Sequence, residues 1–323
     1  MTITIGFEGT AHTLGVGIVD GKKVFADEKS IYSPEKGGLH PRDSSQHMSE
    51  HLHETLEKAL DVSKKSWDDI EALAFSQGPG MGPCLRTVAT AARTLALYHM
   101  KPLIGVNHCV AHIQAGLTVG ELKDPLTLYV SGGNTQVTKL EEGRYRIFGE
   151  TIDIGVGNLL DKFGREVGLA HPAGPKIEML ASEGKEFIEL PYTVKGTDLS
   201  FSGLYNAATW AAEKHPLEDV CYSLQETAFA MLCEVTERAL AHLKAKEILL
   251  TGGVANNKRL SEMVESVADE HGATYYVPKG LCSDNGAMIA MLGEAMHKAG
   301  LETKIEDSQI NQGWRTDQVD VVW

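Results

Sequence analysis

Ile3-Thr-Ile-Gly-Phe-Glu-Gly9 and Leu126-Thr-Leu-Tyr-Val130 are two apolar stretches about 120 residues apart, and each begins the same series of elements. The first precedes apolar runs at 14–19 and 24–26, and the second precedes runs at 136–140 and 145–148. An Asp-Gly pair and a Glu-Gly pair separate the runs, which predicts three strands joined by tight turns in each case. The repetition therefore predicts a chain built from two similar halves.

A second pair of stretches extends the repeat. Residues 70–75 run into Ser76-Gln-Gly-Pro-Gly80, and residues 247–251 run into Gly252-Gly-Val-Ala-Asn256, so each pattern is a buried strand, a glycine turn and a helix. Apolar periodicity predicts helices at 43–62, 84–99, 107–118, 221–244, 258–271 and 285–298. The second half also carries an insertion at 153–203, which is rich in glycine and proline and is expected to be irregular.

Two such halves would face each other across a central cleft lined by glycine loops. Glycine lets backbone N–H groups approach a phosphate closely, so the cleft is predicted to hold a nucleotide. This α/β arrangement resembles the actin, sugar kinase and heat-shock chaperone ATPase superfamily, with its duplicated ribonuclease-H-like halves. The expected domains are 1–105 and 106–299, with 300–323 packing back on the first.

Composition narrows the class of protein. The chain has 323 residues, is 42% hydrophobic and contains 33 glycines, which is enough for a large core. It has no apolar run long enough to span a membrane and no leader-like start, so a cytoplasmic location without membrane contact is expected. Five cysteines without a CxxC pair favour a reducing compartment. The net charge of −14 opposes RNA binding unless a local basic patch or a basic partner compensates.

The sharpest chemical signal is Asn107-His-Cys-Val-Ala-His112. Its two histidines, four residues apart, share one helix face and can bind one metal ion, while Asn107 is a good N-cap after an apolar strand at 101–106. A zinc protease would need glutamate at the position of Cys109. The spacing alone is weak, because His47 and His51 repeat it on a helix where an ordinary surface is expected.

Two further residues complete a candidate metal site. Tyr129 stands at a strand end and Asp284 at a helix start, and the duplicated architecture directs both toward the cleft. Taken singly, they would be a half-buried strand residue and an N-cap. With His108 and His112 they form a set that suits iron, favoured by the phenolate, or zinc as the alternative. Such an ion can polarise a carbonyl or phosphoryl group.

Candidate nucleotide residues follow glycine turns in the second half. Ser131-Gly-Gly-Asn134 is a candidate phosphate loop, and Asp161 could accept both ribose hydroxyl hydrogens, although it could equally lie on a helix surface. Pro172-Ala-Gly-Pro-Lys-Ile-Glu178 offers a further carboxylate. Asn256 and Asn257 could reach a base or ribose, or could serve only as turn and cap residues.

Seven ordered motifs, which span the whole chain, resemble the tRNA threonylcarbamoyladenosine-forming transferase family, formerly described as O-sialoglycoprotein endopeptidases. The motifs are Glu8-Gly-Thr-Ala-His12, Ser76-Gln-Gly-Pro-Gly80, Asn107-His-Cys-Val-Ala-His112, Tyr129-Val-Ser-Gly-Gly-Asn-Thr135, Asp198-Leu-Ser-Phe-Ser-Gly-Leu204, Gly252-Gly-Val-Ala-Asn-Asn257 and Ser283-Asp-Asn-Gly-Ala287. The resemblance implies transfer of threonylcarbamoyl from threonylcarbamoyl-AMP to N6 of the adenosine following the anticodon in ANN-decoding tRNAs. AMP would be the second product.

The resemblance also implies site residues. The metal ligands would be His108, His112, Tyr129 and Asp284. The substrate or nucleotide, as threonylcarbamoyl-AMP, ATP or AMP, would be held by Tyr129, Val130, Ser131, Gly132, Gly133, Asn134, Asp161, Gly174, Glu178 and Asn257. Magnesium could accompany ATP. Glu8 is the candidate general base, because superfamily relatives place an acidic catalytic residue on the loop after the first strand.

The first and third motifs resemble the archaeal and eukaryotic branch, whose members are the catalytic subunits of the KEOPS complex. The implied partners are tRNA, a small atypical kinase or ATPase, a small dimer-forming subunit and a further small tRNA-binding subunit. The helix that carries His47, His51 and His53 is the expected surface for the dimer-forming subunit. Two alternatives stay open, an ATPase or sugar-kinase-like phosphotransferase and a nucleotide-binding scaffold.

Overall fold

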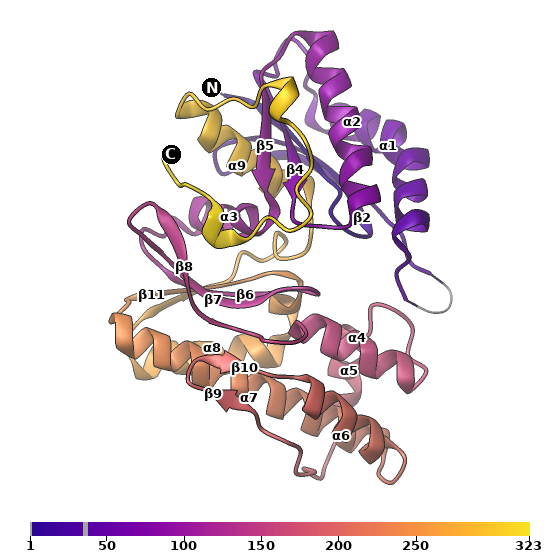
Figure 1. The fold of residues 1–323 in the computed structure, drawn as a ribbon, viewed down its shortest axis with the longest axis vertical. Coiled ribbons are helices and arrows are strands. Elements are labelled where there is room, and N and C mark those ends of the chain that lie inside the picture. Colours follow the sequence, from indigo (N-terminus) through magenta and orange to yellow (C-terminus); the bar gives the residue numbers. More distant parts are fainter. Residues whose placement is uncertain (1, 35–37) are drawn as a thin grey trace.

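The structure is a computed structural model that describes residues 2–34 and 38–323, and it contains one five-stranded mixed sheet in each half (Figure 1). The elements up to the middle of the chain are β1 (Thr4–Glu8), β2 (Thr13–Asp20), β3 (Lys23–Ile31), α1 (Pro41–Ser63), β4 (Ala72–Gly78), α2 (Gly82–His99), β5 (Leu103–Asn107) and α3 (His108–Gly120). The later elements are β6 (Leu126–Val130), β7 (Thr135–Glu141), β8 (Arg144–Glu150), α4 (Val156–Glu166), α5 (Gly174–Ala181), β9 (Val194–Lys195), β10 (Asp198–Leu199), α6 (Ser202–Ala212), α7 (Leu217–Leu243), β11 (Glu247–Thr251), η1 (Gly253–Asn256), α8 (Lys258–Glu270), β12 (Thr274–Tyr276), α9 (Gly286–Lys298), η2 (Ile305–Asp307) and η3 (Thr316–Gln318).

The two sheets have the same topology. The first has the order β3-β2-β1-β4-β5 and the second β8-β7-β6-β11-β12. In both, the first three strands pair antiparallel and the remaining two are added in parallel. The predicted duplication is therefore confirmed strand by strand. Of the strands in these two sheets, only the short strand β12 had no counterpart in the sequence prediction.

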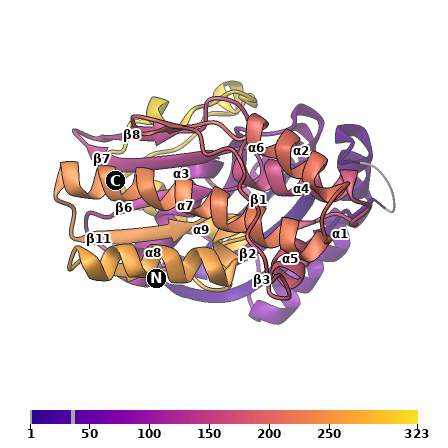
Figure 2. The ribbon, with the colours of Figure 1, turned by 90° about the horizontal axis from the view of Figure 1, so that it is seen from below.

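The halves differ in what connects their third and fourth strands. In the first half this connection carries the single helix α1, whereas in the second it carries α4 to α7. The expectation of irregular structure at 153–203 was wrong for α4 and α5. Helix α4 is amphipathic, with Val156, Leu159, Leu160 and Phe163 buried at helical spacing. This helix was not predicted because glycines interrupt its short apolar pattern. Helix α7 crosses the outer face of the second sheet (Figure 2).

Helix α9 packs on the first sheet at backbone distance. An ideal β-carbon at Gly17 would lie 2.1 Å from the nitrogen of Ala287, and one at Gly286 would lie 2.1 Å from the nitrogen of Gly17. Only residues without a side chain allow this approach. The predicted division places α9 in the second domain, 106–299, apart from the first sheet on which it packs. We propose instead a division that assigns α9 to the first half.

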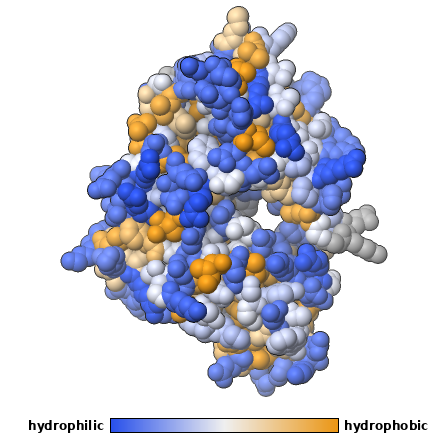
Figure 3. Space-filling model, in the orientation of Figure 1, coloured by the Kyte–Doolittle hydropathy of each residue, from blue (hydrophilic) through white to orange (hydrophobic). Residues whose placement is uncertain are grey.

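The C-terminal segment contacts both halves. The N–H of Thr303 donates to the carbonyl of Leu103 at 2.7 Å, next to the first sheet. Further on, Val321 donates to the carbonyl of Gly143 at 2.7 Å, in the turn between β7 and β8. The space-filling view shows an opening between the two halves (Figure 3). In the described part of the chain, no helix combines the length and apolar character needed to cross a bilayer.

Candidate active site

The histidine pair lies where strand β5 becomes helix α3. Asn107 ends the strand and caps the helix, since its Oδ1 accepts hydrogen bonds from the N–H groups of Cys109 (3.0 Å) and Val110 (3.1 Å). Its Nδ2 donates to the carbonyl of Trp314 at 3.0 Å. A cap of this kind contributes about 1 kcal/mol to helix stability. The predicted position of His108 and His112, in the first turns of a capped helix at a strand end, is confirmed.

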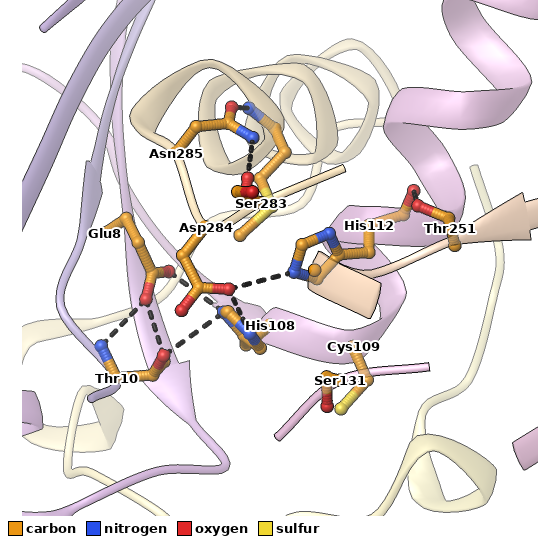
Figure 4. Close-up of polar contacts among 12 residues, drawn as sticks. Glu8, Thr10, His108, Cys109, His112, Ser131, Thr251, Ser283, Asp284 and Asn285 are labelled. Atoms are coloured by element: carbon orange, nitrogen blue, oxygen red, sulfur yellow. Dashed lines mark hydrogen bonds and ion pairs between the residues drawn. The ribbon is translucent and has the colours of Figure 1, made fainter. Parts of the chain in front are cut away.

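Asp284 reaches the histidines from the loop before α9 (Figure 4). Its Oδ1 lies 3.3 Å from Nε2 of His112 and 3.5 Å from Nε2 of His108. The three potential ligand atoms lie within 4.8 Å of one another, and no other such group is found in residues 2–34 and 38–323. The N-cap of α9 is Asn285, whose Oδ1 accepts from the N–H of Met288 at 2.7 Å. The carboxylate of Asp284 is thus not used as a helix cap and can act as a ligand in the candidate metal site.

Glu8 contacts the Nδ1 side of the His108 ring, whereas Asp284 lies on the Nε2 side (Figure 4). Its Oε2 lies 3.0 Å from Nδ1 of His108, while its Oε1 accepts from the N–H and hydroxyl of Thr10 at 2.8 and 2.6 Å. The carboxylate therefore favours the tautomer with hydrogen on Nδ1, which leaves Nε2 as a lone-pair donor facing Asp284. Glu8 is fully buried and both of its oxygens are engaged. This geometry favours a positioning role, and the predicted role as general base remains untested.

Tyr129 lies beside the pair from the end of β6, with its ring centroid 5.4 Å from that of His112. Its hydroxyl and Nδ1 of His112 are buried without hydrogen-bond partners among the described residues. Burial raises the pKa of Tyr129 well above its ordinary value. For His108, burial opposes protonation, but the carboxylates of Glu8 and Asp284 raise the pKa to about 9.

These donors fit a metal ion. Two imidazole nitrogens and a carboxylate converge, and the unpartnered phenol oxygen would become satisfied as a fourth ligand. A nitrogen and oxygen set of this kind suits iron or zinc rather than calcium or magnesium. Glu8 then supplies the outer carboxylate that ligating histidines usually have.

The glycine loop between β6 and β7 faces open space. The hydroxyl of Ser131 accepts from the N–H of Asn134 at 3.1 Å, and the start of α4 donates to the carbonyls of Ser131 and Gly132 at 3.1 Å. Gly132 and Gly133 are exposed, and a β-carbon at Gly133 would meet nothing within 4 Å. Val130 is fully buried below the loop. The loop is thus fixed by its carbonyls while its glycines leave room for a ligand.

The other predicted nucleotide residues lie on elements around this loop. Oδ1 of Asp161, on α4, accepts from the N–H of Ala173 at 2.8 Å, just before Gly174 begins α5. Oε1 of Glu178 accepts from the N–H of Lys258 at 2.8 Å. The side chain of Asn257 caps α8 and donates to Oε1 of Gln225 at 2.9 Å. Of these side chains, that of Asn257 is the most fully engaged within the protein.

Three features escaped the sequence prediction. The N–H and hydroxyl of Thr10 both donate to Oε1 of Glu8. The two residues belong to the same motif, Glu8-Gly-Thr-Ala-His12, but no role was predicted for Thr10. The rings of His12 and His171, from opposite halves, lie 5.3 Å apart, and Nδ1 of His171 lies 3.4 Å from Oδ2 of Asp161. Contacts between remote histidines have no local sequence signal.

Comparisons with known proteins agree with this geometry. The family model described as tRNA N6-adenosine threonylcarbamoyltransferase matches residues 23–291. The enzyme of that name from Thermococcus sibiricus is 54% identical over 99% of this chain and all of its own length. A probable bifunctional tRNA threonylcarbamoyladenosine biosynthesis protein from Methanosarcina mazei is 54% identical over the whole chain, which covers 60% of that relative.

Solved structures support the fold. The crystal structure of HypF from T. kodakarensis aligns with 93% of this chain and 48% of its own, at a TM-score of 0.66 and 16% identity. The ROK hexokinase from Thermus thermophilus aligns with 92% of this chain and 99% of its own, at a TM-score of 0.51 and 14% identity. The predicted actin, sugar kinase and chaperone ATPase fold is confirmed. Together, the family model and the full-length relatives show that the chain belongs to the tRNA N6-adenosine threonylcarbamoyltransferase family.

Proposed function

We propose that the chain transfers threonylcarbamoyl from threonylcarbamoyl-AMP to N6 of the adenosine following the anticodon in ANN-decoding tRNAs, with release of AMP. The observation that carries this proposal is a metal-type cluster of His108, His112 and Asp284 beside an exposed glycine loop. A donor that joins an acyl group to a nucleotide would use the metal site for the acyl group and the glycine loop for the nucleotide. The family membership supplies the reaction class.

The chemistry needs orientation more than a protein nucleophile, because the donor is already a mixed anhydride. Backbone N–H groups of the loop at Gly132 and Gly133 would hold the AMP part. Asp161 and Glu178 would contact the ribose, each through the oxygen not bonded to a backbone N–H. The adenosine amine attacks the carbamoyl carbon, the bond from that carbon to the phosphate oxygen breaks, and AMP leaves with the electron pair, while the amine nitrogen gives up one proton to the departing phosphate or to water. An arylamine needs little prior deprotonation.

A metal ion held by His108, His112, Tyr129 and Asp284 would supply Lewis acidity toward a carbonyl or phosphate oxygen. We favour iron as this ion because the donor set includes a phenol, with zinc as the alternative. In this scheme Glu8 positions His108. Magnesium would be needed only when ATP occupies the cleft.

The partners proposed for this chain are tRNA and the KEOPS subunits, in the cytoplasm. The bifunctional name of one relative is consistent with a biosynthetic partner domain, such as the small kinase. For the small dimer-forming subunit we propose the helices of the first half. Exposed apolar side chains there are Val62 on α1 and Leu97, Tyr98 and Met100 at the end of α2. The further tRNA-binding subunit has no assigned surface.

Product formation separates this function from the alternatives, which the comparisons do not favour. The chain and its partner subunits are incubated with preformed threonylcarbamoyl-AMP and an unmodified ANN-decoding tRNA. AMP release should require the tRNA and should fail when guanosine replaces the adenosine after the anticodon. Phosphate release from ATP without any threonylcarbamoyl transfer would instead indicate a phosphotransferase.

A further inference from the structure

Three arginines have no side-chain partner among residues 2–34 and 38–323, and they lie on elements that border the opening between the halves. The sequence contains nine arginines. Six contact a carboxylate or a serine: Arg93, Arg144, Arg146, Arg238, Arg259 and Arg315. Among the described residues, Arg42, Arg86 and Arg165 have no ion pair and no side-chain hydrogen bond. All three are exposed.

Contacts between elements bring these three arginines together. Arg165, on α4, approaches the segment before α1, because its Nη1 would lie 3.0 Å from a β-carbon at Gly38. The starts of α1 and α2 contact each other, since Sγ of Cys84 donates to the carbonyl of Pro41 at 3.6 Å. Arg42 follows Pro41 directly and Arg86 is two residues beyond Cys84. Figure 1 shows the starts of α1 and α2 on the side of the first half that faces α4.

The same elements hold the two sites inside. The N–H of Met81, just before α2, donates to the carbonyl of Thr10 at 2.7 Å, and Thr10 orders Glu8. On the other side, the N–H of Asn158, in α4, donates to the carbonyl of Gly132 at 3.1 Å. Lys162, one helical turn after Asn158, also has no ion pair in the described part of the chain. Figure 3 shows the opening that these elements border.

We infer that Arg42, Arg86, Lys162 and Arg165 form a docking rim for the phosphate backbone of the acceptor RNA. This inference rests on the proposed function, which makes RNA the acceptor. Unpaired guanidinium groups are strong phosphate ligands, and paired ones are not available. A chain of net charge −14 repels RNA elsewhere, so a local cationic rim would determine where the strand enters. The anticodon loop would then cross the rim with its adenosine toward His108 and the glycine loop.

The test measures binding of a labelled, unmodified ANN-decoding tRNA transcript to the chain at several salt concentrations between about 50 and 200 mM. The rim variants are the pair Lys162→Gln with Arg165→Gln and the pair Arg42→Gln with Arg86→Gln. Each pair should weaken binding about tenfold. It should also make the negative slope of log affinity against log salt shallower, reducing its magnitude by about 1.5. The matched control is Lys246→Gln with Lys279→Gln, two cations outside the rim, which should change neither quantity.

Wild-type affinity and salt slope in both rim pairs would overturn the inference, as would an equal loss in the control or no measurable tRNA binding by the unaltered chain. Binding of AMP, measured in parallel, should stay unchanged in every variant, which excludes a folding defect. The two proposals fail separately. If tRNA binds as described but no threonylcarbamoyl is transferred, the rim stands and the proposed reaction does not.

Discussion

The loops that follow β1 and β6 occupy equivalent positions in the two halves but differ in character: the first begins at a buried carboxylate, and the second is an exposed glycine loop. Glu8 ends β1 at the start of the first loop and is fully buried, with one carboxylate oxygen bonded to His108 and the other to Thr10. After β6, Gly132 and Gly133 are exposed, and their loop is held by its carbonyls, by Ser131 and by Asn134, whose Nδ2 donates to Sγ of Cys109. The first loop supports a metal ligand, and the second leaves space for a substrate.

This difference shows how one duplicated scaffold can be specialised. The shared strand order brings both loops to the same cleft, so a buried charge in one half and open backbone in the other can serve one reaction. Separate roles imply separate defects. Changes at the end of β1 should affect metal binding, and changes in the loop after β6 should affect nucleotide binding.

The largest effect is expected from His108→Ala combined with His112→Ala. Losing two nitrogen ligands should remove the metal and lower threonylcarbamoyl transfer by about a thousandfold or more, because charge stabilisation at the reacting group is lost. Metal content by elemental mass spectrometry and AMP affinity by calorimetry are measured together. AMP affinity equal to that of the unaltered chain would support separate roles, whereas a parallel loss of AMP binding would contradict them.

Gly17→Ala should destabilise the first half. The added β-carbon would lie 2.1 Å from the nitrogen of Ala287, so α9 must shift and carry Asp284 with it. We expect a loss of about 3 kcal/mol in the free energy of unfolding, together with weaker metal binding. Urea unfolding provides the measurement. Gly313→Ala is the control, because a β-carbon there meets nothing within 4 Å. Equal stability of the two variants would show that α9 does not depend on the close approach.

Glu8→Ala should lower metal affinity about 10- to 100-fold, because His108 loses the partner that orients its ring. Glu8→Gln keeps an acceptor of similar size and should have a smaller effect. Metal titration provides the affinities, and the transfer rate is then measured at saturating metal. Recovery of the rate would support the positioning role. A rate that stays low with the site fully loaded would restore Glu8 as a candidate general base.

Gly133→Val should produce the smallest change, confined to the second half. The side chain would enter space that is open in the structure, so folding should be unaffected while AMP affinity falls about tenfold. Metal affinity should equal that of the unaltered chain. Unchanged AMP binding would mean that the nucleotide does not use this loop.

The strand repeat, the capped helix at Asn107 and the histidine pair were all predictable, because each depends on residues close together in sequence. The contact of Glu8 with His108 was not, because it joins residues 100 positions apart. The short helix α4 was missed because glycines interrupt its apolar pattern. For Asp284, the sequence predicted a metal ligand and, taken singly, an N-cap, and in the structure Asn285 is the cap. Which of two adjacent polar residues caps a helix depends on backbone geometry that the sequence leaves open.

The most direct measurement is transfer of labelled threonylcarbamoyl from threonylcarbamoyl-AMP to tRNA by the chain with its partner subunits. The control is the same assembly with His108→Ala and His112→Ala. Labelled N6-threonylcarbamoyladenosine that forms with the unaltered chain and is absent in the control is the predicted result. Equal product in both, or ATP hydrolysis without any product, would contradict a transferase whose reaction depends on this metal site.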